Sequence, residues 1–332
     1  MISPRHRTAA VLATVFVGAL LVPGEPAAGA ADAVRHDPSP SARPPAAMEA
    51  FGIPSDGARL NALFYLAAGP GPHALALFLH GYPGNEKNLD VAQAVRRAGY
   101  DVLYVDYRGN FGSGGTFSFA HALEDTATVL AWVRRPENAA KYHYDPRRIA
   151  LVGHSFGGWL ALLTAGREPA EATATAGGSV SGICVAAIAA WNIGWDGKRF
   201  AEHEDERTAE LADLRDSTDP AGGPIHADAD ALLAEMTSHA AEYDYLANAD
   251  ALASRPLLLV AASRDTPDED IPMHAELARA IKAAGGKSVK SVTFDDDHAF
   301  SSHRLALADA VVDWLRTDCV RAQAKAVTAG KR

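Results

Sequence analysis

The sequence predicts an α/β protein whose mostly parallel sheet is covered by helices on both faces. Two observations lead to this fold class. Short, continuously apolar runs alternate along the chain with longer segments whose apolar residues recur at helical spacing. The apolar runs lack the polar–apolar alternation of half-exposed strands, which indicates strands buried on both faces, as in a parallel sheet.

The strands begin with a hairpin. Residues 51–67 form two short apolar stretches around a Ser-Asp-Gly turn, which is the pattern of two strands joined by a tight loop. Each later run is short and lies between segments of helical spacing or turn residues, as buried strands do. These later strands are expected at residues 73–80, 100–107, 147–153, 182–190, 256–263 and 290–294.

Helices are expected between these strands, because the intervening segments place apolar residues on one face of a helix. The first of them ends at Gly99, a residue that commonly stops a helix. The expected helices cover residues 89–99, 121–135, 156–166, 271–286 and 301–317.

One interval interrupts the alternation. Residues 191–251 are too many for a simple connection. They also contain aromatic side chains, among them Trp191 and Trp195, which are scarce in disordered segments. We therefore expect an ordered helical lid inserted between two parts of the core, residues 49–190 and residues 252–332.

The first residues have the composition of a signal peptide. A short basic start precedes an apolar run of about 15 residues, which is short for a bilayer span of about 20, and small residues follow. We expect residues 1–30 to be removed, residues 31–48 to form a flexible linker, and the mature protein to be secreted or periplasmic without stable membrane insertion. An uncleaved membrane anchor is the alternative.

Composition excludes several other classes of protein. The 332 residues are 48% hydrophobic and 22% charged, with a formal charge of −10 and no dense Lys/Arg cluster, which argues against a nucleic-acid partner.

The only cysteines are Cys184 and Cys319. An even count in an exported chain permits one disulfide, and two separate buried thiols are the alternative. Neither lies in a Cys/His cluster, which argues against structural zinc.

Ser155 is the candidate nucleophile. It occupies the centre of Gly153-His154-Ser155-Phe156-Gly157, which fits the G-x-S-x-G pattern between a predicted strand and a predicted helix. A sharp turn there lifts the hydroxyl clear of the sheet, and the glycines remove side chains that would collide. An ordinary turn that happens to contain a serine is the alternative.

Asp265 and His298 are the candidate partners of the serine. A serine hydroxyl needs a base to take its proton, and the base needs an orienting acid. In this architecture the acid and the histidine follow later strands in that order, as Asp265 and His298 do. The competitors are Asp268, Glu269 and Asp270 for the acid, and His274 and His303 for the base.

Two backbone N–H groups are candidates for an oxyanion hole. The N–H of Phe156 lies at the positive end of the helix predicted to follow the sharp turn at Ser155, which we call the elbow. The N–H of Tyr82 lies in the tight loop after the strand at residues 73–80, and the Tyr82 hydroxyl is a second option. The glycine-rich segment 106–115 lacks the spacing of a phosphate-binding loop, so we expect it to shape the rim of the site.

With these residues in place, the chain resembles the α/β-hydrolase superfamily over about residues 50–190 and 252–317. Two of its motifs, HGYPGN and DYRGNFGSGG, look like those of serine esterases and peptidases related to dienelactone hydrolases and acylaminoacyl peptidases. The resemblance implies an eight-stranded sheet, two-step acyl transfer to water, and neither a metal nor an organic cofactor. The motifs that carry it, in the family's order, are HGYPGN, DYRGNFGSGG, GHSFGG, SRDTPDED and DDDHAF.

Three functions are consistent with the sequence. The first is a secreted serine hydrolase that cleaves carboxylic esters or small amides. The second is an exopeptidase acting on short peptides. The third is a non-catalytic binding protein of the same fold, although such proteins typically lose one of three reactive groups that this chain keeps. An exopeptidase needs a charged anchor for a peptide terminus, for which the candidates are Glu124, Asp125, Glu202, Glu204 and Asp205.

Overall fold

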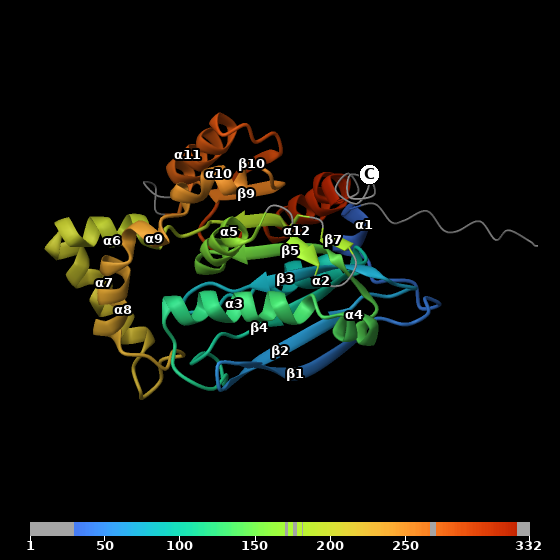
Figure 1. The fold of residues 1–332 in the computed structure, drawn as a ribbon, viewed down its shortest axis with the longest axis horizontal. Helices are drawn as coiled ribbons and strands as arrows, with labels where there is room; N and C mark the ends of the chain where they lie inside the picture. Colours follow the sequence, from blue (N-terminus) through green and yellow to red (C-terminus); the bar gives the residue numbers. More distant parts are fainter. Residues whose placement is uncertain (1–29, 170–171, 175–177, 181, 266–269, 324–332) are drawn as a thin grey trace, which may run out of the picture.

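An eight-stranded sheet runs through the protein in the order β1-β2-β4-β3-β5-β8-β9-β10 (Figure 1). The structure is a computed structural model that describes residues 30–169, 172–174, 178–180, 182–265 and 270–323. From β4 to β10 neighbouring strands pair in parallel, and β1 and β2 add an antiparallel edge. The expected eight-stranded, mostly parallel sheet is confirmed.

The observed strands match the predicted apolar runs and add one small hairpin, β6–β7, that sequence patterning missed. Their bounds are β1 Ala47–Ser55, β2 Ala58–Leu66, β3 His73–Leu79, β4 Tyr100–Val105, β5 Tyr144–His154, β6 Ala172–Ala174, β7 Gly178–Val180, β8 Cys184–Ile188, β9 Leu257–Ala262 and β10 Val289–Phe294.

The helices include all of those expected, together with short ones that have too few residues for a periodic signal. Their bounds are α1 Ala30–Arg35, α2 Leu89–Arg97, α3 Phe119–Val133, α4 Pro136–Tyr142, α5 Phe156–Arg167, α6 Ile193–Glu202, α7 Glu204–Ser217, α8 Ala229–Ser238, α9 Ala240–Tyr243, α10 Ala249–Leu252, α11 Asp270–Ala283 and α12 Arg304–Trp314; η1 Tyr245–Asn248 and η2 Leu315–Cys319 are single turns.

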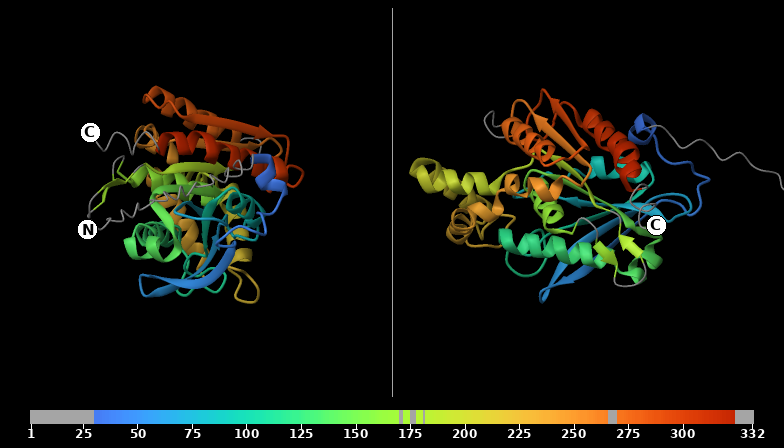
Figure 2. Two further views of the ribbon diagram at one scale, coloured as in Figure 1. Left: turned by 90° about the vertical axis from the view of Figure 1, so that its right-hand side faces the viewer. Right: turned by 45° about the horizontal axis from the view of Figure 1, so that its top comes forward.

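The central strands are apolar throughout because each of them contributes to two cores. In β3, Leu75 and Leu77 pack on one face of the sheet, whereas Ala76 and Phe78 pack on the other. Helices α3, α5 and α11 share the first core, and α1, α2 and α12 share the second (Figure 2). Burial on both faces is the physical reason for the continuous apolar runs.

Helices α6 to α10 lie in the chain between β8 and β9. In Figure 1, α6, α7 and α8 stand together at one end of the sheet, beyond the core helices. Their apolar side chains join the core on the α5 side of the sheet, for example Phe200 and Met236. The insertion is therefore ordered and packed against the fold.

The expected flexible linker over residues 31–48 requires a correction. Its first residues belong to α1, where Ala33 and Val34 are buried in the core formed with α2 and α12. Arg97 donates to the Ala33 carbonyl over 2.7 Å and to the Val34 carbonyl over 3.0 Å. Arg35 pairs with Asp309 at 3.0 Å. The Pro- and Ser-rich composition of the whole segment indicated a flexible chain, although its first residues form a helix that packs against the core. The predicted signal peptide falls almost wholly outside the described residues.

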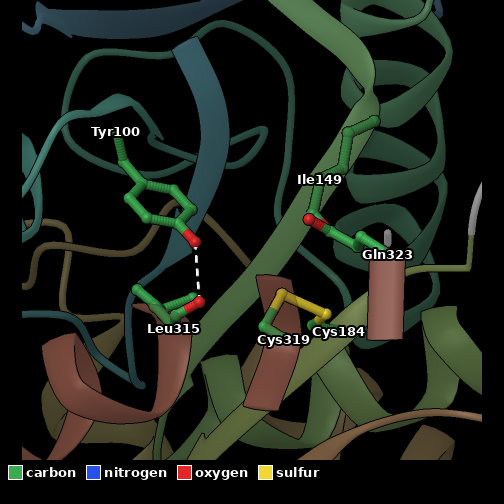
Figure 3. Close-up of a disulfide and its surroundings, with 6 residues drawn as sticks. All are labelled: Tyr100, Ile149, Cys184, Leu315, Cys319 and Gln323. Carbon is green, nitrogen blue, oxygen red and sulfur yellow. Dashed lines mark hydrogen bonds between the residues drawn. A yellow bond between two sulfur atoms is a disulfide. The ribbon is translucent and has the colours of Figure 1, made fainter. Parts of the chain in front are cut away.

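Cys184 and Cys319 are joined by a disulfide, with Cα atoms 5.7 Å apart. The bridge ties β8 to the turn η2 at the end of α12. Figure 3 shows it beside the hydrogen bond from the Tyr100 hydroxyl to the Leu315 carbonyl, which is 2.8 Å long. The terminal helix is therefore fixed to the sheet by covalent and polar contacts.

Within the described part of the chain, no helix combines the length and apolarity needed to cross a bilayer.

Candidate active site

Ser155 lies at the junction of β5 and α5, where the sequence predicts an elbow. Its backbone has φ 56° and ψ −123°, a conformation that costs a non-glycine residue on the order of 1–3 kcal/mol. The Ser155 N–H donates to the Ile188 carbonyl over 2.8 Å, and the Ser155 carbonyl accepts from the Trp191 N–H over 3.2 Å. The end of β8 and the residues after it therefore hold the turn in place.

Two glycines make this turn sterically feasible. A Cβ on Gly153 would lie 1.9 Å from the carbonyl oxygen of Gly157. A Cβ on Gly157 would lie 1.9 Å from the carbonyl oxygen of Leu79. Since both oxygens belong to backbone, no rotamer change could relieve the overlap. The two glycines are therefore required by the close approach of α5 to β5 and β3.

Asp265 and His298 follow β9 and β10 and meet at the same edge of the sheet. The imidazole Nδ1 donates a short hydrogen bond to Asp265 Oδ2. The Asp265 side chain is 11% exposed and that of His298 is 44% exposed, so the carboxylate is shielded while the ring keeps an open face. Of the competing acids, Asp268 and Glu269 lie outside the described residues, and Asp270 begins α11.

The competing histidines are bonded elsewhere. His303 Nδ1 lies 2.9 Å from Oδ2 of Asp296, a fully buried carboxylate that also accepts from backbone N–H groups. The Nε2 of His274 accepts from the Ala190 N–H over 3.2 Å, and burial lowers the pKa of His274 to about 4. Neither histidine lines the cavity that contains Ser155.

Ser155, Asp265 and His298 line one cavity of about 710 Å³. Ser155 is 7% exposed. The His298 ring bonds to Asp265, and the His298 carbonyl accepts from His154. Among the described residues, no hydrogen bond joins the His298 ring to Ser155 Oγ. Such contacts are often long in unliganded sites and shorten when substrate binds.

The loop after β3 passes directly against Ser155. A Cβ on Gly81 would lie 3.1 Å from Ser155 Cβ and 3.5 Å from Ser155 Oγ. The next residue, Tyr82, lines the cavity. Its hydroxyl lies 2.5 Å from Ser217 Oγ on α7, and burial raises the pKa of Tyr82 to about 12. Because the phenol is bonded to the helical insertion, the backbone N–H is the remaining hydrogen-bond donor of Tyr82.

The first residue of α5 is Phe156. Its N–H belongs to the helix N-terminus, where amides lack intrahelical acceptors and carry partial positive charge. Its side chain is fully buried against aromatic neighbours, including Trp159 and Phe119. The backbone of Phe156 is therefore held rigidly next to the Ser155 hydroxyl.

The segment 106–115 supports the loop after β3 and does not line the cavity. The Tyr107 hydroxyl donates to the His80 carbonyl over 3.0 Å, and the two rings stack with centroids 4.3 Å apart. His80 Nδ1 in turn donates to the Gly81 carbonyl over 2.8 Å. The expectation that this segment forms the rim is wrong, because none of its residues lines the cavity and the rings of Tyr107 and Phe111 pack against His80 instead.

The helical insertion supplies a wall of the cavity that sequence reasoning missed. Helix α7 presents Glu210, Asp213 and Asp216 on one face, and Asp219 follows in the next loop. The i, i+3 spacing of the first three was the signal that could have identified them. The acids suggested by the sequence, Glu124, Asp125, Glu202, Glu204 and Asp205, do not line the cavity.

The model of the alpha/beta hydrolase family matches residues 76–313, which is more than half of the chain. The protein belongs to the alpha/beta hydrolase family. The resemblance inferred from the motifs is therefore confirmed, and membership supports a hydrolase activity.

Among curated proteins, this alpha/beta hydrolase is 32% identical over 121 residues to the uncharacterised protein YfhR of Escherichia coli (strain K12). That match covers 35% of the chain and 40% of YfhR, so the chain spans less than half the length of this relative.

Solved structures that share the fold of this alpha/beta hydrolase include Est1E and an acylaminoacyl peptidase. Est1E from Butyrivibrio proteoclasticus, solved with ferulic acid bound, has a TM-score of 0.60 and 19% identity, covering 81% of this chain and 99% of Est1E. The acylaminoacyl peptidase of Pyrococcus horikoshii has a TM-score of 0.59 and 14% identity, covering 83% of this chain and 42% of that one. At these identities the likeness concerns the fold.

Proposed function

We propose that the protein is a serine hydrolase that cleaves carboxylic esters or small amides. One observation carries the proposal: Ser155, presented by a strained elbow, lines the same cavity as the His298 imidazole that is bonded to Asp265. A serine hydroxyl becomes a useful nucleophile when a base takes its proton and a third group orients that base. Ser155 is the nucleophile, His298 is the base and Asp265 is the orienting acid.

The reaction has two halves. In the first, His298 Nε2 takes the proton of Ser155 as Oγ forms a bond to the substrate carbonyl carbon. The tetrahedral intermediate collapses, the bond to the leaving group breaks, and His298 protonates the departing alcohol or amine. In the second half, His298 deprotonates a water that attacks the acyl-serine, and the proton returns to Ser155 Oγ as the acid leaves.

Negative charge develops on the carbonyl oxygen in both halves. The backbone N–H groups of Tyr82 and Phe156 are the proposed donors to that oxygen. Both residues flank Ser155, one in the loop that contacts it and the other at the start of α5. Loss of one such donor in other hydrolases reduces kcat by about 10²–10³-fold.

Turnover of chromogenic esters tests this proposal. The purified protein should hydrolyse p-nitrophenyl acetate or butyrate, and Ser155→Ala should lower kcat by at least about 10⁴-fold. Ser238→Ala is the matched control, because its hydroxyl is exposed on α8 and bonds only to carbonyls of its own helix. Equal turnover by wild type and Ser155→Ala would remove Ser155 from the mechanism.

The same assay separates the two other functions. An exopeptidase should cleave aminoacyl-p-nitroanilides in preference to simple esters. A binding protein of this fold should hydrolyse neither class at a rate above that of Ser155→Ala. The substrates in both enzymatic cases are small esters or short peptides.

Export to an oxidising compartment is part of the proposal. The basic and apolar composition of residues 1–30 is typical of a signal peptide, and a disulfide is usual in exported proteins. Expression of the whole chain in a bacterial host, followed by fractionation and N-terminal sequencing, should recover a form that starts near Ala30 outside the cytoplasm. Recovery of the uncleaved chain in the membrane fraction would favour the anchor alternative.

A further inference from the structure

The cavity that contains Ser155 is strongly acidic. Its lining includes no lysine or arginine among the described residues, although the chain has 31 of them. One of its carboxylates, Asp265, is bonded to His298, and another, Asp196, pairs with Arg199 at 3.1 Å. The carboxylates contributed by α7 and the loop after it are Glu210, Asp213, Asp216 and Asp219.

The position of these acids is fixed by α7. Asp213 and Asp216 are three residues apart, so both project from the same face of the helix. Ser217, one residue further, is buried and bonds to the Tyr82 hydroxyl. Tyr82 follows Gly81, which contacts Ser155. The hydrogen bond between Ser217 and Tyr82 therefore connects α7 to the loop that lies against Ser155, and it helps to keep the acidic face of α7 turned towards the cavity.

Asp213 and Asp216 have no ion-pair partner within the described part of the chain. Like charges three or four residues apart on a helix are destabilising by about the same amount as opposite charges are stabilising. The fold therefore keeps a locally unfavourable pair facing the cavity, and a cation that entered the cavity would relieve the repulsion.

A second observation points to a ligand in this cavity. Ser155 is more than nine-tenths buried, and its hydroxyl has no hydrogen-bond partner among the described residues while it faces the cavity. Aromatic rings of Tyr82, Trp191 and Trp195 also line the cavity, and such rings attract organic cations. The described carboxylates do not group into a set of three that could hold a metal ion, which favours an organic cation.

We infer that the substrates are esters or amides that carry a cationic ammonium group, protonated or quaternary, which lies against Asp213 and Asp216 while the carbonyl reaches Ser155. This inference rests on the proposed function and specifies its substrate class. The cationic group could belong to the acyl part, as in an amino-acid ester, or to the leaving group, as in a choline ester. Both substrates present an ammonium group to the acidic wall, which is the set of carboxylates contributed by α7 and the loop after it.

Matched substrate pairs test the inference. L-alanine methyl ester is compared with methyl isobutyrate, in which a methyl group replaces the ammonium, and acetylcholine is compared with the neutral 3,3-dimethylbutyl acetate. The ratio of kcat/KM within each pair is measured for wild type and for Asp213→Asn/Asp216→Asn. The wild-type ratio is then divided by the ratio for the double variant, and this division cancels the intrinsic difference in reactivity between the two esters.

In the double variant, the preference for the cationic member should fall by about fivefold to tenfold, because each exposed carboxylate contributes a modest attraction. The wild-type preference should also weaken as salt is raised from 0.02 M to 0.5 M. Glu204→Gln/Asp205→Asn is the matched control, since it removes the same charge from α7 outside the cavity. It should leave the preference within about twofold of wild type.

A binding measurement keeps the inference separate from catalysis. The Ser155→Ala protein is titrated by calorimetry with L-leucinamide and with the neutral 2,4-dimethylpentanamide. Tighter binding of L-leucinamide, lost in the Asp213→Asn/Asp216→Asn background, supports the inference even if no ester is turned over. Equal affinities for the two amides, or a substrate preference unchanged in the double variant, would overturn it while leaving the proposed hydrolase function intact.

Discussion

His154 Nε2 lies 2.8 Å from the backbone carbonyl oxygen of His298. The residue before the proposed nucleophile therefore bonds to the loop that carries the proposed base. His154 is buried, and burial lowers its pKa to about 3, so the ring is neutral near pH 7. Because a carbonyl only accepts hydrogen bonds, Nε2 carries the proton, and the rings of His154 and His298 lie with centroids 4.7 Å apart.

This contact predicts a positioning role for His154. Replacement by alanine should lower kcat for p-nitrophenyl butyrate by about fivefold to tenfold with little change in KM, because the lost hydrogen bond loosens the His298 loop. His154→Gln, which restores a donor of similar reach, should recover most of the activity. An unchanged kcat in His154→Ala would show that other contacts position His298.

Asp265 should support catalysis mainly by accepting the Nδ1 proton of His298, which leaves Nε2 free to act as the base. Asp265→Asn preserves the shape of the side chain but removes the charged acceptor at Nδ1, and kcat should fall by about 10²–10⁴-fold. Asp295→Asn is the control, since this carboxylate is 81% exposed beside the same loop. Steady-state kinetics at several pH values provide the measurement, and a loss below threefold would contradict the assigned role.

The packing of the elbow can be tested without an activity assay. Gly157→Ala places a Cβ 1.9 Å from the Leu79 carbonyl oxygen, so we expect a loss of about 3 kcal/mol or more in the free energy of unfolding. Gly222→Ala is the control, because nothing lies within 4 Å of its added Cβ. Urea denaturation gives both values, and a change below about 1 kcal/mol in Gly157→Ala would contradict the described geometry.

Buried histidines should make stability fall in acid. Burial lowers the pKa of His154 to about 3 and the pKa values of His80 and His274 to about 4. In the unfolded chain a histidine titrates at about pH 6.5, so below that pH the unfolded state binds protons that the native state excludes. The free energy of unfolding should therefore decrease from about pH 6.5 towards pH 4, by up to about 1.4 kcal/mol per pH unit for each histidine.

Buried carboxyl groups oppose this trend. Burial raises the pKa of Asp101 to about 6 and also raises the pKa values of Asp125 and Asp196, so these groups favour the native state as the pH falls. The pKa shifts of the three histidines are larger and outweigh them. Urea midpoints at pH 7.5, 6.0, 5.0 and 4.5 measure the slope, which should be smaller in His274→Leu and unchanged in His36→Gln, a variant of an exposed histidine. A flat profile would mean that these rings are protonated in the native state.

The Cys184–Cys319 bridge closes a loop with a sequence separation of 135 residues. Loops of this size give a predicted stabilisation of about 4–5 kcal/mol through the unfolded state. Reduction should raise the intact mass by two hydrogens, and Cys184→Ala/Cys319→Ala should shift the urea midpoint downwards. No mass change on reduction would show that the thiols are separate in the isolated protein.

The sequence predicted the sheet and the positions of Ser155, Asp265 and His298 because each signal is local. An apolar run ends, and a reactive side chain follows it. The docking of α1 was missed because it depends on the long-range contact of Ala33 and Val34 with α2 and α12. The acidic wall was missed for a similar reason: the side of α7 that faces Ser155 is set by the bond between Tyr82 and Ser217, which no local pattern encodes.

The placement of α1 has a practical consequence. This helix docks against α2 and α12, and Figures 1 and 2 show it at the end of the molecule remote from α6, α7 and α8. In a form of the protein that starts at Ala30, a tag or tether joined to that residue would therefore lie at the end of the molecule remote from the cavity wall formed by α7. Enzyme immobilised on a resin through that end should keep its access to dissolved substrate.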